Sequence, residues 1–426
     1  MRCSYACNSA EHKLERRRFL GTAAAGIGAY SGLGVMARPA ISHELASQQK
    51  RVICIFLAGG SSQLETWDPK PKTDTGGPFL AIPTSVPGIH ISELLPKTAL
   101  QMHHLSLIRS INTNENDHGL GRYMMETGRK KMGATEFPHL GAVTAKALDR
   151  ESPLPGNIHV SSGAGSRRSD SSYLGPKYAS IVVGAKGGLR NSTRMNGLTV
   201  TAEDHRQWFR RRANSRFLER RRTAETDAYA QSFEQALQLM EKRDIFDVSK
   251  EPQSLVEKYG DHELGKQCLL GRRLLESGIS YVQVSHSNYD THNENFNFHL
   301  EQMGEFDQSF SALISDLSER GMLESTLVVV MSEFGRTPRI NRYYGRDHWG
   351  KSWSIAMAGC GIQAGAVIGK TNKNGTDVTD RQVDHRHLFH TYLHAVGVDS
   401  SDEFHVGGRS MPIADPSAGP ITELLA

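Results

Sequence analysis

The stretch Thr326-Leu-Val-Val-Val-Met-Ser-Glu-Phe-Gly-Arg-Thr-Pro338 decides the fold prediction. Its first six residues are almost all apolar and rich in β-branched side chains, which is typical of a parallel strand buried on both faces. A polar loop begins directly afterwards, at Ser332. Because ligand sites in open α/β sheets lie at the C-terminal ends of the strands, this loop is where functional residues are expected first.

Other segments repeat the pattern of an apolar run that ends in a turn or a polar loop. They predict strands at residues 51–57, 104–111, 157–160, 281–285 and 353–358. Helices are predicted between and after them, at residues 119–132, 264–276, 306–320 and 387–396. Strands that alternate with helices predict an α/β fold with a mostly parallel central sheet and helices on both faces.

Residues 202–250 differ in composition from the rest of the chain. They are rich in Arg, Glu, Gln and Ala, with basic clusters at 210–212 and 220–222. We predict a helical insertion here, formed by a pair of long helices. We interpret the basic clusters as a solvated helix face rather than as an anion-binding patch.

The first 40 residues have the layout of an export signal. The run Arg16-Arg17-Arg18-Phe19-Leu20 fits the twin-arginine pattern, and a Gly- and Ala-rich apolar run with small residues near Ala37 follows it. We predict a twin-arginine signal peptide at 1–40, a single domain at 41–426, and a periplasmic or otherwise exported location. The twin-arginine export machinery is then a partner. The apolar run is shorter than the ~20 residues that span a bilayer, so no permanent membrane span is expected. A surface protein held by an uncleaved signal is a weaker alternative.

Charge and cysteine content narrow the function further. A net charge of +4 over 426 residues gives no reason to expect a nucleic-acid partner. Cys3 and Cys7 lie at the extreme N-terminus, and Cys54, Cys268 and Cys360 are scattered without a CxxC pair. We expect these three to be buried thiols, not a disulfide framework.

Carboxylates and imidazoles gather in three segments that follow predicted strands. The candidate metal ligands in these segments are Asp290, His292, Glu333, Asp347 and His348. Carboxylate oxygens and imidazole nitrogens together suit zinc, manganese or iron. One such pair is more often a surface or core pair, so it is the three segments together that make metal binding a serious alternative.

A fourth polar cluster, residues 114–119, follows a predicted strand and opens a predicted helix. Backbone N–H groups at a helix N-terminus favour an anion, and His118 could then lie beside a phosphate or sulfate group. The alternative is ordinary helix capping by Asn116 or Asp117. The residues alone leave both interpretations open.

Five segments together resemble a known family: LAGGSSQLETWDPKP (57–71), HGLGRYMMETG (118–128), YDTH (289–292), VVVMSEFGRTPRIN (328–341) and GRDHWG (345–350). They are similar to the bacterial domain-of-unknown-function 1501 family, whose members commonly carry twin-arginine signals. The resemblance runs from about residue 50 to the C-terminus. That family is grouped with the alkaline phosphatase and sulfatase superfamily, so the resemblance implies an alkaline phosphatase-like fold.

The resemblance also implies roles for single residues. His118 stands where sulfatases carry their nucleophilic Cys or Ser, and Arg122 matches the arginine of the same motif. The superfamily's metal ligands resemble a set in this chain, namely Asp290, His292, Glu333 and His348, with Asp347 as a ligand or as a partner of one. Phe334 replaces a metal-binding histidine, which favours one metal ion over two.

The resemblance therefore implies a metal-dependent hydrolase of phosphate or sulfate esters. It would use a divalent metal such as zinc or manganese and take an anionic ester as substrate. His118 would act on the ester, while Arg122 and Arg336 would steady the anionic group through their planar donors. The alternative is a non-catalytic exported binding or scaffold protein that retains the fold, which the identities of His118 and Phe334 favour.

Overall fold

A computed structural model describes residues 49–133, 135–149, 154–161, 170–184, 197–220, 224–406 and 408–425. The predicted signal peptide, with Cys3 and Cys7, lies outside the described residues. Residues 45–426 form one compact unit. In the part of the chain that the structure describes, no helix has both the length and the apolar character needed to cross a membrane.

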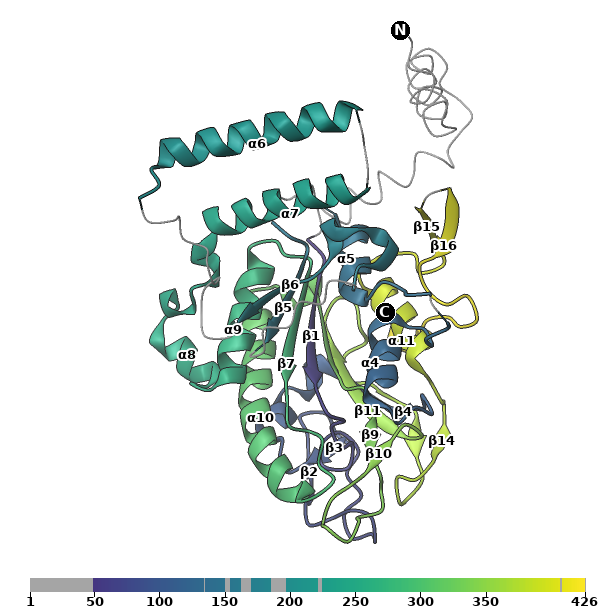
Figure 1. The fold of residues 1–426 in the computed structure, drawn as a ribbon. Helices are drawn as coiled ribbons and strands as arrows, with labels where there is room; N and C mark the ends of the chain where they lie inside the picture. The colour runs from purple at the N-terminus through teal and green to yellow at the C-terminus, as the bar shows by residue number, and fades with distance from the viewer. Residues whose placement is uncertain are drawn as a thin grey trace, which may run out of the picture. The chain divides into compact units, whose positions relative to one another are not determined.

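An eight-stranded sheet with the order β12-β4-β11-β8-β1-β7-β5-β6 runs through this unit (Figure 1). Its strands are β1 (Arg51–Leu57), β4 (Leu105–Ile111), β5 (Asn157–Ser161), β6 (Ile181–Gly184), β7 (Tyr281–His286), β8 (Thr326–Met331), β11 (Trp353–Ala358) and β12 (Val367–Ile368). Strand β11 is antiparallel to both β4 and β8, and the other pairs are parallel. The predicted mostly parallel sheet is confirmed.

The sheet is buried on both faces. In β1, Ile53, Ile55 and Leu57 join the core on one face, while Val52, Cys54 and Phe56 join the core on the other. Such two-sided burial explains why the strand reads as a continuous apolar run instead of an alternating one.

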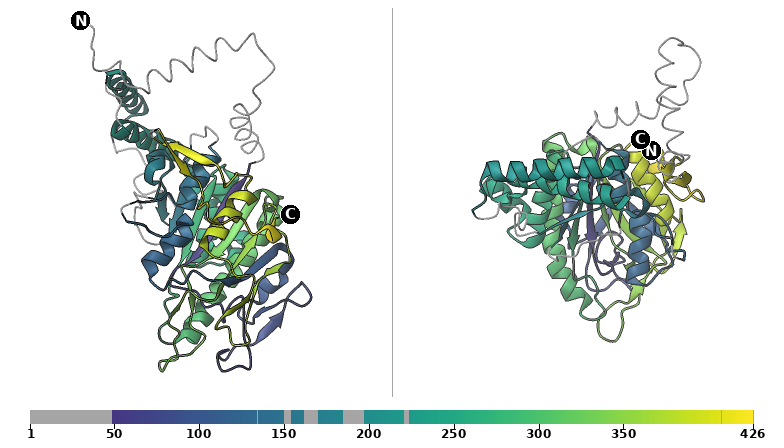
Figure 2. Two further views of the ribbon diagram at one scale, coloured as in Figure 1. Left: turned by 90° about the vertical axis from the view of Figure 1, so that its right-hand side faces the viewer. Right: turned by 45° about the horizontal axis from the view of Figure 1, so that its top comes forward.

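Helices cover both faces, as predicted (Figures 1 and 2). The first face packs against α3 (Pro96–Leu100), α8 (Gln253–Tyr259), α9 (Glu263–Glu276) and α10 (Asn295–Glu319). The second face packs against α4 (His118–Thr127), α5 (Leu140–Ala147) and α11 (His385–Ala395). Cys54, Cys268 and Cys360 are free and buried, which confirms their interpretation as core thiols.

Two helix boundaries differ from prediction for local reasons. Helix α4 ends at Thr127 because Gly128 adopts a left-handed conformation with φ of 66°. A Cβ at Gly128 would lie 2.5 Å from atoms of Phe389, so only glycine fits there. Helix α10 begins at Asn295, earlier than predicted, because its first turns are polar and give no apolar periodicity.

The remaining elements are short, apart from two helices in the compositionally distinct region. These are α6 (Val200–Arg220) and α7 (Ala224–Glu241). Four small hairpin sheets complete the described strands: β2 (Ala81–Pro83) with β3 (His90–Ser92), β9 (Gly335–Arg336) with β10 (His348–Trp349), β13 (Lys370–Thr371) with β14 (Val378–Asp380), and β15 (Glu403–Val406) with β16 (Arg409–Pro412).

Candidate metal centre

Loops that follow neighbouring strands meet at the C-terminal edge of the sheet. Asp290 follows β7, Glu333 follows β8, and the β9–β10 ladder pairs Arg336 with His348. The turn after β1 lies against these loops, since a Cβ at Gly59 would lie 2.5 Å from the backbone nitrogen of Asp290. With a φ of 117°, Gly59 also adopts a conformation that side chains disfavour.

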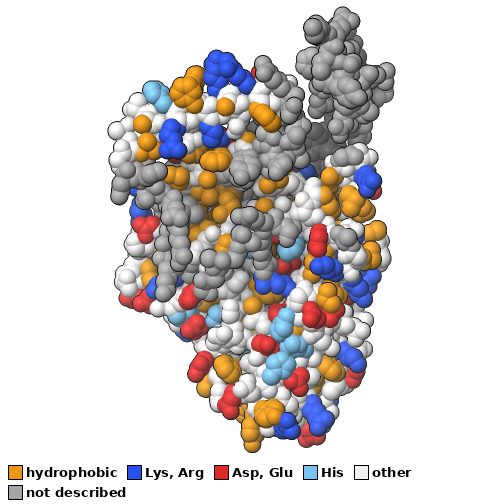
Figure 3. Space-filling view, viewed as in Figure 1, with side chains coloured by type: hydrophobic (Ala, Val, Ile, Leu, Met, Phe, Trp, Pro, Cys, Tyr) orange, Lys and Arg blue, Asp and Glu red, His pale blue; other side chains and the backbone are white. Residues whose placement is uncertain are grey.

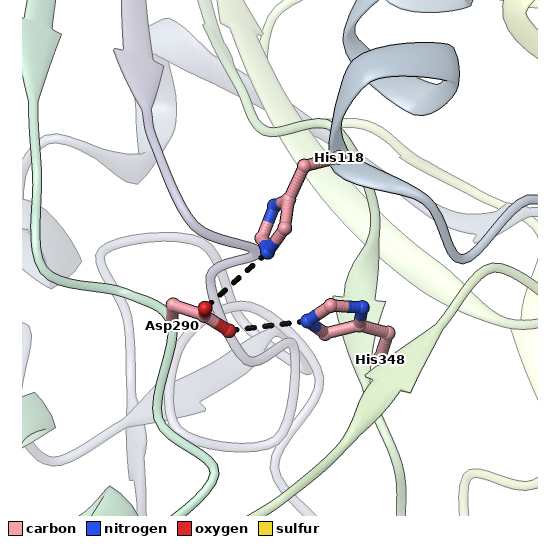
Figure 4. A group of neighbouring side chains, drawn as sticks. All are labelled: His118, Asp290 and His348. Atoms are coloured by element: carbon pink, nitrogen blue, oxygen red, sulfur yellow. Dashed lines mark hydrogen bonds and ion pairs between the residues drawn. The ribbon is translucent and has the colours of Figure 1, made fainter.

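Three imidazoles surround the carboxylate of Asp290, and Figure 4 shows two of them pointing at it. The Nε2 atoms of His292 and His348 each lie 3.1 Å from Asp290 Oδ1. The Nε2 atom of His118 lies 3.3 Å from Asp290 Oδ2. We call these four residues the metal-centre cluster. Histidine side chains also gather visibly on the surface in Figure 3.

Each of the three rings uses its Nδ1 atom to bind an oxygen acceptor. The pairs are His118 with Glu333 Oε1 at 2.8 Å, His292 with Asp347 Oδ1 at 2.7 Å, and His348 with the Asn116 carbonyl at 2.7 Å. Carboxylate and carbonyl oxygens accept hydrogen bonds, so each Nδ1 carries a proton and donates. Such partners orient imidazoles that ligate metals and leave the lone pair on Nε2.

Two of the unprotonated Nε2 atoms lie too close to each other for this arrangement to be stable without a proton or cation between them. The Nε2 atoms of His292 and His348 lie 2.9 Å apart, and both face a carboxylate oxygen. Neutral rings in this arrangement would turn lone pairs towards one another, so a proton or a cation is needed between them. Donor atoms about 3 Å apart are what ligands held about 2.0–2.1 Å from a zinc ion show. The donor atoms of His118, Asp290 and His348 all lie within 4.8 Å of one another, so these three residues fit a divalent transition metal, and His292 Nε2 lies beside them.

The central carboxylate of the cluster is ionised, and the cluster is open to solvent. Although burial acts in the opposite direction, the hydrogen bond from Arg336 and its positive charge hold the pKa of Asp290 well below its usual range. The hydrogen bond to Glu333 raises the pKa of His118. The side chains of His118, His292 and Asp290 are 40%, 47% and 48% exposed, so a small molecule can reach them.

Glu333 was expected to bind metal, but its oxygens are occupied by the protein. Its Oε1 accepts hydrogen bonds from His118 Nδ1 and from the backbone N–H of Gly59, and its Oε2 accepts one from Ser332. The contact with Nδ1 orients the His118 ring. Asp347 makes the same kind of contact with His292, and whether it is a ligand or a partner of one stays a prediction.

Arg336 lies next to the metal-centre cluster but does not face solvent. Its Nη2 donates to Asp290 Oδ1 at 2.6 Å, and its side chain is 0% exposed. The remaining nitrogens bind backbone carbonyls of the turn after β1 and of Arg346. The guanidinium is therefore enclosed by Asp290 and backbone carbonyls, and its predicted contact with an anionic group of a ligand stays a prediction.

Arg122 lies one turn further along α4 than His118. Its Nε donates to Glu126 Oε1 at 3.0 Å, and its guanidinium stacks 4.5 Å from the ring centroid of Phe56. These contacts join Arg122 to a buried carboxylate and not to the metal-centre cluster. Its predicted role of steadying an anionic group stays a prediction.

Two contributors to the cluster were not foreseen. Phe334 packs its ring 4.9 Å from that of His118 and 4.4 Å from that of His348, so this residue supports the imidazoles. Asn116 binds His348 through its carbonyl and the N–H of Gly350 through its side chain. Its position in the polar cluster at 114–119 was a usable signal, but a backbone contact leaves no trace in side-chain identity. The helix cap itself is Asp117, which accepts from Leu120.

Comparisons with known proteins give a family and several distant structural similarities. The family model described as "Protein of unknown function (DUF1501)" matches residues 49–425. No curated protein matches the sequence.

Similar solved structures include the PsFucS1 sulfatase from Pseudoalteromonas sp., with 13% identity, a TM-score of 0.40, and coverage of 85% of this chain and 72% of that one. Alkaline phosphatase from the Antarctic bacterium TAB5 has 12% identity and a TM-score of 0.38, with 82% and 98% covered. The phosphonate monoester hydrolase SpPMH from Silicibacter pomeroyi has 12% identity and a TM-score of 0.40, with 86% and 78% covered.

Proposed function

This chain belongs to the DUF1501 family, and we propose that it is a metal-dependent hydrolase of phosphate or sulfate esters. We further propose that it works outside the cytoplasm after export by its twin-arginine signal. Zinc or manganese is the metal that its nitrogen and oxygen donors suit best.

One observation carries this proposal. Three imidazoles, each fixed through Nδ1, turn their Nε2 atoms towards one ionised carboxylate on an accessible surface. The pKa of His118 is raised and that of Asp290 is lowered, and shifted titratable groups of this kind cluster at functional sites.

The residues of the chain divide into those that would hold the metal and those that orient them. Asp290, His118, His292 and His348 supply the donor atoms, so we assign His118 to the metal instead of to nucleophilic attack. Glu333, Asp347 and the Asn116 carbonyl set the ring orientations. A divalent cation held there would act as a Lewis acid on an ester oxygen and make water a stronger nucleophile at neutral pH.

A second candidate is a non-catalytic binding or scaffold protein that keeps this fold. The observation that favours it is that the helix α4 begins with His118, so no hydroxyl or thiol stands at that position. Covalent catalysis by serine or cysteine is then not available from this residue. Hydrolysis would have to rely on water.

Metal content and turnover separate the two candidates. The mature protein should carry about one equivalent of zinc or manganese, and the metal-loaded form should hydrolyse 4-nitrophenyl phosphate or 4-nitrophenyl sulfate. Asp290→Asn should abolish both metal and turnover. Metal binding without turnover on either ester would favour the binding protein. Absence of metal after reloading with both ions would overturn the metal centre itself.

A further inference from the structure

A pocket of about 620 Å³ opens directly beside the metal-centre cluster. It shares His292 and Asp347 with the site, and the rest is lined by Thr337 and by residues 339–343. A molecule bound at the cluster would therefore extend into this pocket. The side chains that line the pocket would then contact the part of the substrate away from the reacting ester.

Two arginines belong to that lining. Arg339 and Arg342 are exposed, and neither forms an ion pair with a carboxylate among the described residues. The guanidinium of Arg342 contacts the side chain of Tyr343, which leaves most of its donors available. Most other arginines near the site are occupied, as Arg336 and Arg346 show.

The segment that carries these arginines is fixed to the metal centre. Asn341 donates from Nδ2 to the carbonyl of His292 at 2.8 Å, and its Oδ1 accepts from the backbone of Tyr343 and Gly345. The backbone N–H of Glu294 binds the carbonyl of Tyr343. Because these bonds tie the segment to His292, the pocket keeps a set position relative to the donor atoms.

Charge indicates what the pocket would bind. The cluster and its partners contain three carboxylates, those of Asp290, Glu333 and Asp347, against the single guanidinium of Arg336. A divalent cation would bring that group close to neutrality, so it would hold one anionic group by coordination and offer little attraction beyond it. The positive charge that remains comes from Arg339 and Arg342.

We propose that this pocket binds a second anionic group of the substrate. The preferred substrate would then carry two anionic groups, such as a sugar with two sulfate or phosphate monoesters, one at the metal and one at Arg339 and Arg342. The guanidinium suits this task because its planar donors match sulfate, phosphate and carboxylate oxygens. This inference rests on the proposed function for the identity of the ligand as a substrate.

Non-hydrolysable sulfonates test the inference without requiring turnover. Isothermal titration calorimetry on the zinc-loaded protein should show that benzene-1,3-disulfonate binds about tenfold more tightly than benzenesulfonate, as expected for added charge-assisted hydrogen bonds. In Arg339→Gln/Arg342→Gln this advantage should disappear. The affinity for benzenesulfonate should change by less than about twofold, because that ligand uses only the metal.

The matched control is Arg206→Gln/Arg216→Gln, which removes two exposed arginines from α6. The control should keep the full preference for the disulfonate. Equal affinity of the wild type for both sulfonates would overturn the inference, as would an equal loss for both in the pocket variant. If the protein prefers the disulfonate but hydrolyses no ester, the pocket inference stands and the hydrolase proposal is rejected. Ester hydrolysis by a protein without the preference for the disulfonate would support the hydrolase and overturn the pocket inference.

Discussion

Among the described residues, two of the clusters that place histidines beside a carboxylate differ in how their hydrogen bonds are used. One is the metal-centre cluster around Asp290. The other, which we call the Glu126 cluster, comprises Glu126, Arg122, His139, His159 and Gln283. Glu126 Oε1 accepts hydrogen bonds from Arg122 Nε at 3.0 Å and from Gln283 Nε2 at 3.2 Å, and its Oε2 lies 3.2 Å from His139 Nδ1. The Glu126 side chain is 4% exposed. By residue type alone the two clusters are alike.

The difference is one of donors and acceptors. In the Glu126 cluster, donors fill the carboxylate, and although burial opposes it, His139 and Arg122 lower the pKa of Glu126 to about 2. In the metal-centre cluster, the Nε2 atoms of three imidazoles face Asp290, and a proton or a cation is needed between them. Counting which atoms are already satisfied therefore separates a structural network from a binding site.

The strongest test of this distinction is to break the buried network. Glu126→Ala should lower the free energy of unfolding by about 3–5 kcal/mol, because it leaves buried charges without their partner. Urea denaturation measures the change. The metal content of the folded fraction should match that of the wild type, and loss of metal in this variant would mean that the two clusters are not independent.

Removing a donor from the metal-centre cluster should lower metal affinity. His292→Ala and His348→Ala should each weaken zinc affinity by more than about a hundredfold, which exceeds the usual effect of losing an orienting partner. Competition with a chromogenic chelator gives the affinity. His205→Ala, an exposed histidine on α6, is the matched control and should bind zinc as the wild type does. An unchanged affinity in either site variant would remove that ring from the ligand set.

The orienting carboxylates offer a finer test. Asp347→Asn should reduce zinc affinity by about 10–100-fold, because the Nδ1–H of His292 loses its anionic acceptor while the ring remains. The same chelator competition measures it. An effect as large as that of His292→Ala would indicate that Asp347 binds the metal directly.

The smallest expected effect concerns acid stability of the Glu126 cluster. Burial lowers the pKa of His159 to about 4. Below its ordinary value of 6.5 the unfolded chain takes up a proton that the folded chain resists, so stability falls as pH drops from 6.5 towards 4. For the chelator-treated protein this group should cost about 1–2 kcal/mol between pH 7 and pH 5.

The variant His159→Gln isolates that contribution. Its urea midpoint should fall less than that of the wild type over the same pH interval. His139, whose pKa is raised, contributes stability that is present below 6.5 and is lost at higher pH, so it does not account for the acid loss. Parallel pH profiles for the variant and the wild type would contradict the assignment.

The sequence predicted the fold best where burial is complete. The bounds of β1, β8 and β11 were obtained because each is mostly apolar and a polar residue or a glycine lies close to each end. The antiparallel direction of β11 was not predicted, since strand direction is set by how loops return and not by the composition of the strand. The start of α10 was missed because its first turns lack apolar periodicity.

For the site, the sequence predicted which residues lie close together better than it predicted the contacts that each residue makes. Asp290, His292 and His348 were grouped correctly in space from their places after strands. The part played by Glu333 depends on which of its oxygens His118 and Gly59 occupy, and only the folded loops decide that. The enclosure of Arg336 likewise comes from carbonyls contributed by distant segments.

The Nδ1 contacts described above have a consequence for motion. They join the segment before α4, the loop after β7 and the loop after β8, which are far apart in the chain. An ion bound to the Nε2 atoms would link these loops to one another across the edge of the sheet. Removing it should speed amide hydrogen exchange in these three loops together while the strands beneath stay protected.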